Sequence, residues 1–133
     1  MVSKHAGSCL CGQVRFEIEG DFYRFFFCHC QRCRKGTGTA HGANLFSASA
    51  KLTWLSGQDK VIQYNVPDSR HARTFCSVCG GALPRERPGI LVVPAGCLDT
   101  DVHTPPTAHI FIASRANWDN GLDSVPAFDG LPS

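Results

Sequence analysis

Alternation of apolar and polar residues predicts β-strands along most of the chain. Val14, Phe16 and Ile18 alternate with polar and charged neighbours, which is the pattern of a strand with one buried face. Shorter apolar runs predict further strands at 44–46, 52–55, 60–65, 90–93 and 109–112. No stretch has the period of a long amphipathic helix. The sequence therefore predicts a mainly β fold of short, mostly antiparallel strands with few or no long helices.

Four stretches lack this alternation. The apolar run 22–27 leads into a cysteine-rich segment, and its three consecutive phenylalanines are expected in the core. The segment 34–44 is rich in glycine and threonine, and we expect a loop or short turn there. The basic run at 70–73 is interpreted as a solvated surface. The last residues, 117–133, are expected to form an irregular cover over the core.

Length and composition indicate a single domain over residues 1–133. The formal net charge of +2 is too small to indicate a nucleic-acid partner. The first residues contain no apolar stretch typical of a secretory signal, and the longest apolar run, 90–98, is too short to cross a bilayer. We therefore expect a cytoplasmic protein without a membrane or nucleic-acid partner, and the sequence leaves its oligomeric state open.

Eight cysteines are the unusual feature of the composition. An even number permits disulfides, but the chain lacks both an export signal and the cysteine density of a disulfide scaffold. Seven of the eight fall into three tight motifs, C-x-C, C-x-C-x-x-C and C-x-x-C, and these spacings are typical of metal ligands. A C-x-C pair is also poorly placed to bond with itself, because the small ring would be strained. Metal binding is the favoured interpretation.

The central motif contains Cys28, Cys30 and Cys33. In an extended chain Cys28 and Cys30 point to one side and His29 to the other. The C-x-x-C spacing then lets a turn return the sulfur of Cys33 to the same point. Three thiolates with no fourth cysteine nearby predict a zinc ion with one open coordination position, which is the arrangement of a catalytic site.

Three cations flank the last cysteine of this motif, namely Arg32, Arg34 and Lys35. Zinc with three thiolates carries a formal charge of −1, so nearby cations stabilise it. The same side chains could also hold an anionic substrate, and they are the predicted substrate-binding residues.

The favoured partition of the other motifs places Cys9 and Cys11 with Cys76 and Cys79 in a closed, structural zinc site. This partition uses every motif cysteine. An alternative combines cysteines of the central motif with Cys76 and Cys79, and it leaves Cys9 and Cys11 without a site. Cys97 stands apart, either as a buried free thiol or as a fourth ligand that would close the second site.

The six histidines are scattered along the chain. His29 adjoins the central motif but points away from two of its sulfurs, so we expect it beside the site or at the surface instead of on the metal. His109 begins a predicted strand, where a hydrogen-bonded structural histidine is the expectation.

Three motifs resemble those of one known family. The segments G-S-C-L-C-G-Q-V-R-F, C-H-C-Q-R-C-R-K-G-T-G-T and F-C-S-V-C-G-G-A-L resemble the glutathione-dependent formaldehyde-activating enzymes, whose domain also occurs in centromere protein V. The later segments A-G-C-L-D, A-H-I-F-I-A-S-R and D-G-L-P, together with Trp118, are similar to the C-terminal half of that family. The resemblance covers nearly the whole chain in the same order.

The resemblance implies a fold of coiled, mostly antiparallel β-sheets with one structural and one catalytic zinc. The two ligand sets of the family pattern agree with the favoured partition: Cys9, Cys11, Cys76 and Cys79 for the first, and Cys28, Cys30 and Cys33 for the second. The implied reaction joins formaldehyde to glutathione, which is a carbon–sulfur lyase reaction run in reverse. Zinc would bind the thiolate or polarise the aldehyde, and the cations at 32–35 would meet the carboxylates of the tripeptide.

A second hypothesis treats both zinc ions as structural and the chain as a binding module for a protein or nucleic-acid partner. A fourth protein ligand at the second zinc, such as Cys97, would favour the module. An exchangeable water there would favour the enzyme.

Overall fold

The computed structural model describes residues 3–132, which form three small β-sheets and one short α-helix. The strands are β1 (Lys4–Ser8), β2 (Arg15–Glu19), β3 (Arg24–Cys28), β4 (Gly42–Ser47), β5 (Lys51–Ser56), β6 (Val61–Asn65), β7 (Ala72–Cys76), β8 (Arg85–Arg87), β9 (Ile90–Pro94) and β10 (Ala108–Ile110). The helix α1 spans Gln31–Thr37, and four 3-10 turns follow: η1 (Gln58–Lys60), η2 (Ala95–Cys97), η3 (Ile112–Ser114) and η4 (Leu122–Ser124). The prediction of a mainly β fold is confirmed.

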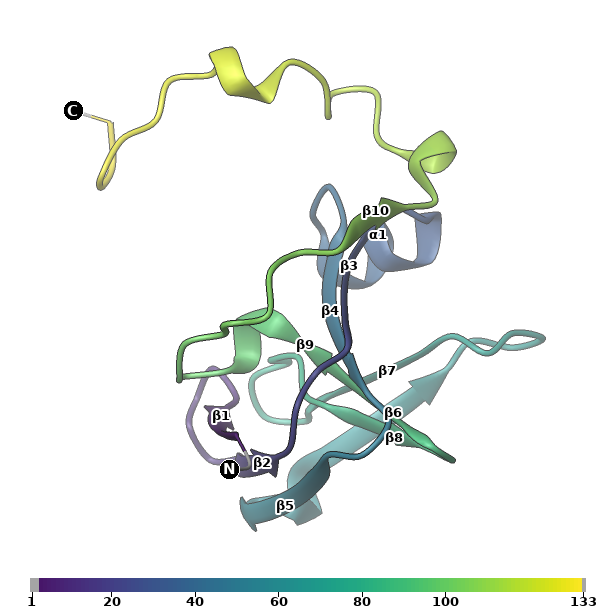
Figure 1. Cartoon of the computed structure of the whole chain (residues 1–133), viewed down its shortest axis with the longest axis vertical. Helices are drawn as coiled ribbons and strands as arrows, with labels where there is room; N and C mark the ends of the chain where they lie inside the picture. Colours follow the sequence, from purple (N-terminus) through teal and green to yellow (C-terminus); the bar gives the residue numbers. More distant parts are fainter. Residues whose placement is uncertain (1–2, 133) are drawn as a thin grey trace.

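The strands are ordered β1-β2-β5 in the first sheet, β10-β3-β4-β9-β8 in the second and β6-β7 in the third. The pairings between these strands are antiparallel except that of β10 with β3, which is parallel. In Figure 1 the first sheet lies at the lower end of the sheet region, whereas α1 and β10 lie together at its upper end. No helix among residues 3–132 has the length and apolarity needed to cross a membrane.

The core forms where the first two sheets meet. The alternation in β2 directs Phe16 and Ile18 inward, and both side chains are fully buried in one cluster with Leu45 and Val93. Burial of each such side chain contributes about 1.5–3 kcal/mol. Gly7 on β1 is part of this packing, because a Cβ at this position would collide with the Phe16 ring.

The second sheet carries the residues of the predicted catalytic motif at one end. Cys28 is the last residue of β3 and pairs with Gly42, the first residue of β4. At the opposite edge of this sheet, β8 pairs with β9 and contributes Arg85 and Arg87. Cys28, the first cysteine of the motif, and these arginines therefore belong to one sheet although they are far apart in sequence.

The segment that follows Cys30 is helical, so the prediction of a loop over 34–44 is wrong for its first residues. The Sγ atom of Cys30 accepts a hydrogen bond from the backbone N–H of Cys33 at 3.3 Å and so caps α1. This is the position where Ser, Thr, Asp or Asn is usually found. The helix ends at Gly38, whose φ of 69° lies in the left-handed region that glycine adopts without strain.

The prediction that Phe25, Phe26 and Phe27 lie in the core is confirmed only in part, and only for Phe25. All three residues, Phe25–Phe27, are half-buried, and of these Phe25 packs against the core cluster. Successive side chains of a strand point to opposite faces of the sheet, and of the three only Phe25 reaches the core cluster.

The C-terminal segment does not cover the core, so that prediction is wrong for the described residues 117–132; Ser133 lies outside them. The large apolar side chains of this segment are exposed, from Trp118 to Leu131. Figure 1 shows the chain after β10 leading away from the sheets. The change of direction begins at Phe111, whose φ is 55°. The strand β10 therefore ends at Ile110, two residues before the end predicted from the sequence.

Two cysteine clusters and an adjoining cavity

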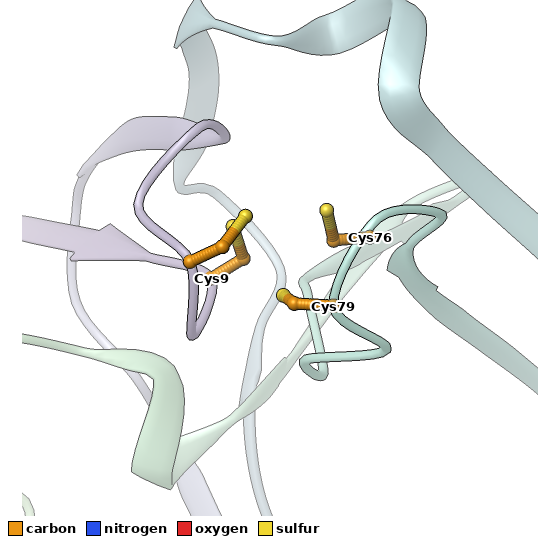
Figure 2. A group of neighbouring side chains, drawn as sticks. Cys9, Cys76 and Cys79 are labelled. Atoms are coloured by element: carbon orange, nitrogen blue, oxygen red, sulfur yellow. The ribbon is translucent and has the colours of Figure 1, made fainter.

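Four cysteine sulfurs lie within 4.8 Å of one another, those of Cys9, Cys11, Cys76 and Cys79. Cys9 and Cys11 lie in the turn between β1 and β2, Cys76 ends β7, and Cys79 follows in a tight turn. Figure 2 shows Cys9 on one loop facing Cys76 and Cys79 on the other. The structure thus brings these cysteines together as the favoured partition predicts.

Backbone amides surround this four-cysteine cluster. Three of them donate hydrogen bonds to sulfur: Val14 N–H to Cys9 Sγ at 3.3 Å, Val78 N–H to Cys76 Sγ at 3.4 Å and Gly81 N–H to Cys79 Sγ at 3.4 Å. Such donors favour the thiolate over the thiol. Hydrogen bonds from the backbone of Cys11 and Gly81 lower the pKa of Cys79 to about 6.

The second cluster contains Cys28, Cys30 and Cys33, whose sulfurs also lie within 4.8 Å of one another. Cys28 ends β3, Cys30 caps α1, and Cys33 lies on the first turn of that helix. Gly42 on β4 lies against this turn, because a Cβ there would be in ordinary van der Waals contact with Cys33, 3.5 Å from its Sγ. Burial raises the pKa of the Cys33 thiol, so a bound cation is needed to keep this side chain as a thiolate.

Either cluster could hold a metal ion, and thiolate ligands suit zinc. The sulfurs of Cys9 and Cys11 are 3.6 Å apart, near the ~3.8 Å expected for two ligands of a tetrahedral zinc with bonds of about 2.3 Å. A disulfide would bring them to about 2.05 Å, and all eight cysteines are free. Within residues 3–132, the three-cysteine cluster has no fourth ligand: no histidine, carboxylate or further cysteine joins it.

A cavity of about 510 Å³ opens beside the three-cysteine cluster. All three of these cysteines line it, and Phe26, Phe46 and Val92 supply apolar surface from β3, β4 and β9. The volume lies within the range of about 300–1,000 Å³ typical of small-molecule sites. The four-cysteine cluster contributes no residue to the lining of this cavity.

Five arginines line the same cavity: Arg32, Arg70, Arg73, Arg85 and Arg87. The lining contains neither aspartate nor glutamate. Over the described part of the chain, Lys60 forms an ion pair with Asp59 and the ring of His29 contacts Asp119, and neither contact involves these arginines. The cavity therefore has a surplus of positive charge next to its sulfur ligands.

The interpretation of the run at 70–73 as a solvated surface is wrong for His71 and Arg73. Both side chains are half-buried and line the cavity. Burial lowers the pKa of His71, and the charges of Arg85, Arg32 and Arg73 lower it further. His71 is therefore neutral at pH 7.

The predicted substrate-binding residues occupy different places. Arg32 lines the cavity, whereas Lys35 lines only an adjoining groove beside Tyr64, to which Arg32 also contributes. Arg34 belongs to neither lining, and its Nε atom is buried without a hydrogen-bond partner.

Sequence reasoning missed Arg85 and Arg87, because the polar stretch 84–89 gave no apolar signal. One weaker signal was present. The two arginines flank Glu86 at a spacing of two, which places them on the same face if the stretch is a strand.

His29 and His109 contact each other and belong to neither cysteine cluster. His29 is only 1% exposed, so the alternative of a surface position is wrong. Its Nε2 is hydrogen-bonded to Nδ1 of His109 at 2.8 Å, which confirms the structural role expected for His109. The Nδ1 of His29 lies 3.2 Å from Asp119 Oδ2 without forming a well-aligned hydrogen bond. Neither cysteine cluster includes His29.

Cys97 belongs to the hydrophobic core and not to either cluster. Burial raises the pKa of its thiol to about 12. It is a buried free thiol, and the alternative of a fourth ligand to the second cluster is wrong.

Comparison with known proteins agrees with the cysteine pattern. Residues 4–114 match the family model described as "Glutathione-dependent formaldehyde-activating enzyme". A protein of Halomonas elongata named "Putative glutathione-dependent formaldehyde-activating enzyme" is 32% identical over 125 residues, which cover 84% of this chain and 77% of that protein. A crystal structure of a Rhodobacter sphaeroides protein superposes with a TM-score of 0.55 at 22% identity, over 78% of this chain and 98% of that one. The last likeness supports the fold alone.

Proposed function

Because the chain belongs to the family of glutathione-dependent formaldehyde-activating enzymes, we propose that it is a zinc-dependent enzyme, formally a carbon–sulfur lyase. It acts on the adduct of an aldehyde with glutathione or another small thiol, as a single domain in the cytoplasm, where thiols stay reduced. The observation that carries this proposal is the three-cysteine cluster at the wall of a ligand-sized cavity.

The two clusters have different roles in this proposal. The four sulfurs at Cys9, Cys11, Cys76 and Cys79 complete a tetrahedral ligand set, as structural zinc sites do. The three sulfurs at Cys28, Cys30 and Cys33 leave one position for a substrate. Zinc bound there would supply a coordination position for the substrate sulfur or a Lewis acid for the aldehyde oxygen.

The reaction needs no oxidant or reductant. The thiol sulfur attacks the carbonyl carbon, a carbon–sulfur bond forms, the carbon–oxygen π bond breaks, and the thiol proton ends on the new hydroxyl oxygen. The apolar residues Phe26, Phe46 and Val92 reduce the water around the reacting sulfur. The arginines of the cavity favour an anionic thiolate over the neutral thiol.

The test combines metal content with an exchange rate. Protein purified under reducing conditions should contain two zinc ions per chain, and Cys30→Ser should contain one while keeping its fold. Exchange of formaldehyde between free glutathione and its hydroxymethyl adduct, measured by NMR, should be faster with the wild type and return to the uncatalysed rate with Cys30→Ser. Cys97→Ala is the matched control and should behave as the wild type. A wild type that holds two zinc ions but leaves the exchange rate unchanged with every small thiol would refute the proposal.

A further inference from the structure

The surplus of positive charge in the cavity exceeds what the sulfur cluster requires. Three thiolates and one zinc ion would sum to a formal charge of −1, whereas five arginines line the same cavity. One cation could balance the cluster, and the other four have no acidic partner among residues 3–132. Three of the five arginines, Arg73, Arg85 and Arg87, are half-buried. Half-buried cations without partners are costly, so an anionic ligand of the cavity is the physical expectation.

Two of these arginines are held in place by the protein. The stem of Arg73 packs on α1 at Gly36, where an added Cβ would lie 2.7 Å from Arg73 Cδ. The guanidinium of Arg73 lies 5.6 Å from the centre of the Phe75 ring. Arg85 donates a hydrogen bond from Nη1 to the backbone oxygen of Arg70 at 3.2 Å. Because a guanidinium has five N–H donors, most of those of Arg85 remain available for a ligand.

A buried polar group points to the same conclusion. Thr74 is 7% exposed, lines the cavity, and its hydroxyl has no hydrogen-bond partner in the structure. A buried hydroxyl normally has a partner. A ligand oxygen in the cavity would provide an acceptor for it.

We propose that Arg73 and Arg85 form a carboxylate-binding wall in the cavity that the three-cysteine cluster also lines, so that the enzyme selects thiols carrying a carboxylate. This inference rests on the proposed function and names its substrate class. These two arginines lie on β7 and β8. Arg34 and Lys35, which adjoin the cysteine motif in sequence, do not line the cavity. A guanidinium and a carboxylate pair through two parallel hydrogen bonds, which gives both affinity and orientation.

Binding is measured first, by calorimetry on the zinc-loaded wild type, with S-methylglutathione and its diethyl ester as ligands. Methylation blocks the sulfur, so any affinity reports the rest of the cavity. Loss of charge-assisted hydrogen bonds should weaken binding of the ester roughly ten- to hundredfold. Arg85→Gln and Arg73→Gln should each weaken binding of the acid by about tenfold and should narrow the difference in affinity between acid and ester.

Two controls distinguish specific contacts from general charge. Arg24→Gln removes an exposed arginine that lies over Tyr23 outside the cavity and should bind as the wild type does. Arg85→Lys keeps the charge but loses the planar fork, and should fall between wild type and Arg85→Gln. Melting temperatures of all variants show whether each still folds. If Arg85→Gln does not fold, Arg73→Gln still tests the proposal.

Equal affinity for acid and ester in the wild type, or an equal loss in Arg24→Gln, would overturn the carboxylate wall. Rate measurements with glutathione and its diethyl ester then separate the two proposals. If the protein accelerates exchange equally with glutathione and its diethyl ester, the proposed enzyme activity stands and the carboxylate-binding wall is overturned. If binding depends on the arginines but the exchange rate does not increase with either thiol, the cavity is an anion-binding site and the proposed enzyme activity is overturned.

Discussion

The two cysteine clusters both gather sulfurs within 4.8 Å, yet they differ in chain span and in surroundings. Cys9 and Cys79 belong to loops from opposite halves of the sequence, whereas Cys28 and Cys33 are separated by a single short turn. The first cluster joins β1 and β2 to β7, and the second borders a cationic cavity. The difference teaches that the same ligand chemistry can serve as a cross-link or as a binding surface, depending on what the sulfurs connect.

The largest expected effect comes from removing one sulfur from each cluster. Cys76→Ser should destabilise the protein by about 3 kcal/mol or more, because it breaks the metal cross-link and places a hydroxyl in the core. At about 4 °C per kcal/mol, the melting temperature should fall by at least ~12 °C. Cys30→Ser should melt within a few degrees of the wild type and lose activity. Equal melting temperatures for the two variants would contradict this division of roles.

A smaller, stepwise effect is expected on chelation. A zinc chelator should remove the metal of the three-cysteine cluster first, since three ligands and an open position hold it less tightly than four. Far-ultraviolet circular dichroism should stay constant during that step and change only when the second zinc leaves. Zinc release, followed with a colorimetric indicator, should therefore be biphasic. One phase that coincides with unfolding would mean that both ions support the fold.

Two glycines extend the comparison to the backbone around each cluster. At Gly81 an added Cβ would lie 2.8 Å from the backbone nitrogen of Leu10, which cannot move without shifting the neighbouring cysteines. At Gly42 the nearest atom would be Asn44 Nδ2 at 3.2 Å, the end of a side chain that can move. Gly81→Ala should therefore cost about 1–3 kcal/mol in the free energy of unfolding, and Gly42→Ala less than about 1 kcal/mol. Urea denaturation of both variants measures this, and the reverse order would be incompatible with a rigid four-cysteine cluster.

The smallest effect concerns the positive charge of the cavity beside the three-cysteine cluster, and it is read from the pKa of His71. Arg85 is one of the cations that, after burial itself, lower the pKa of His71. Arg85→Gln removes that charge, so the pKa of His71 should rise, while burial still holds it below its usual value. The ring proton shift of His71 followed by NMR against pH gives this pKa. Arg15→Gln, which alters an arginine of the first sheet, should leave it unchanged, and an unmoved pKa in Arg85→Gln would argue against contact between the two groups.

The sequence predicted the cysteine groups well because ligands of one ion recur at short, fixed spacings. It also predicted β2, because one alternating stretch suffices to define a half-buried strand. It failed for α1, where the cap is a cysteine rather than one of the usual capping residues. It failed for Arg73 as well, since the burial of a cation depends on β8 and α1, which no local pattern around residue 73 reveals.

The order of the cysteines along the chain also bears on protein synthesis. Cys28, Cys30 and Cys33 are made almost together, so their sulfurs can gather once β3 and α1 have left the ribosome. Cys9 and Cys11 have to wait for Cys79, which at about 5–20 residues per second takes roughly 3–14 s. During that interval the nascent chain carries two thiols without their partners, open to oxidants and to other metal ions. In the proposed two-zinc protein, the metal cross-link between the two loops would thus be the later of the two sites to form, and the cell's supply of zinc at that moment would decide how many chains complete it.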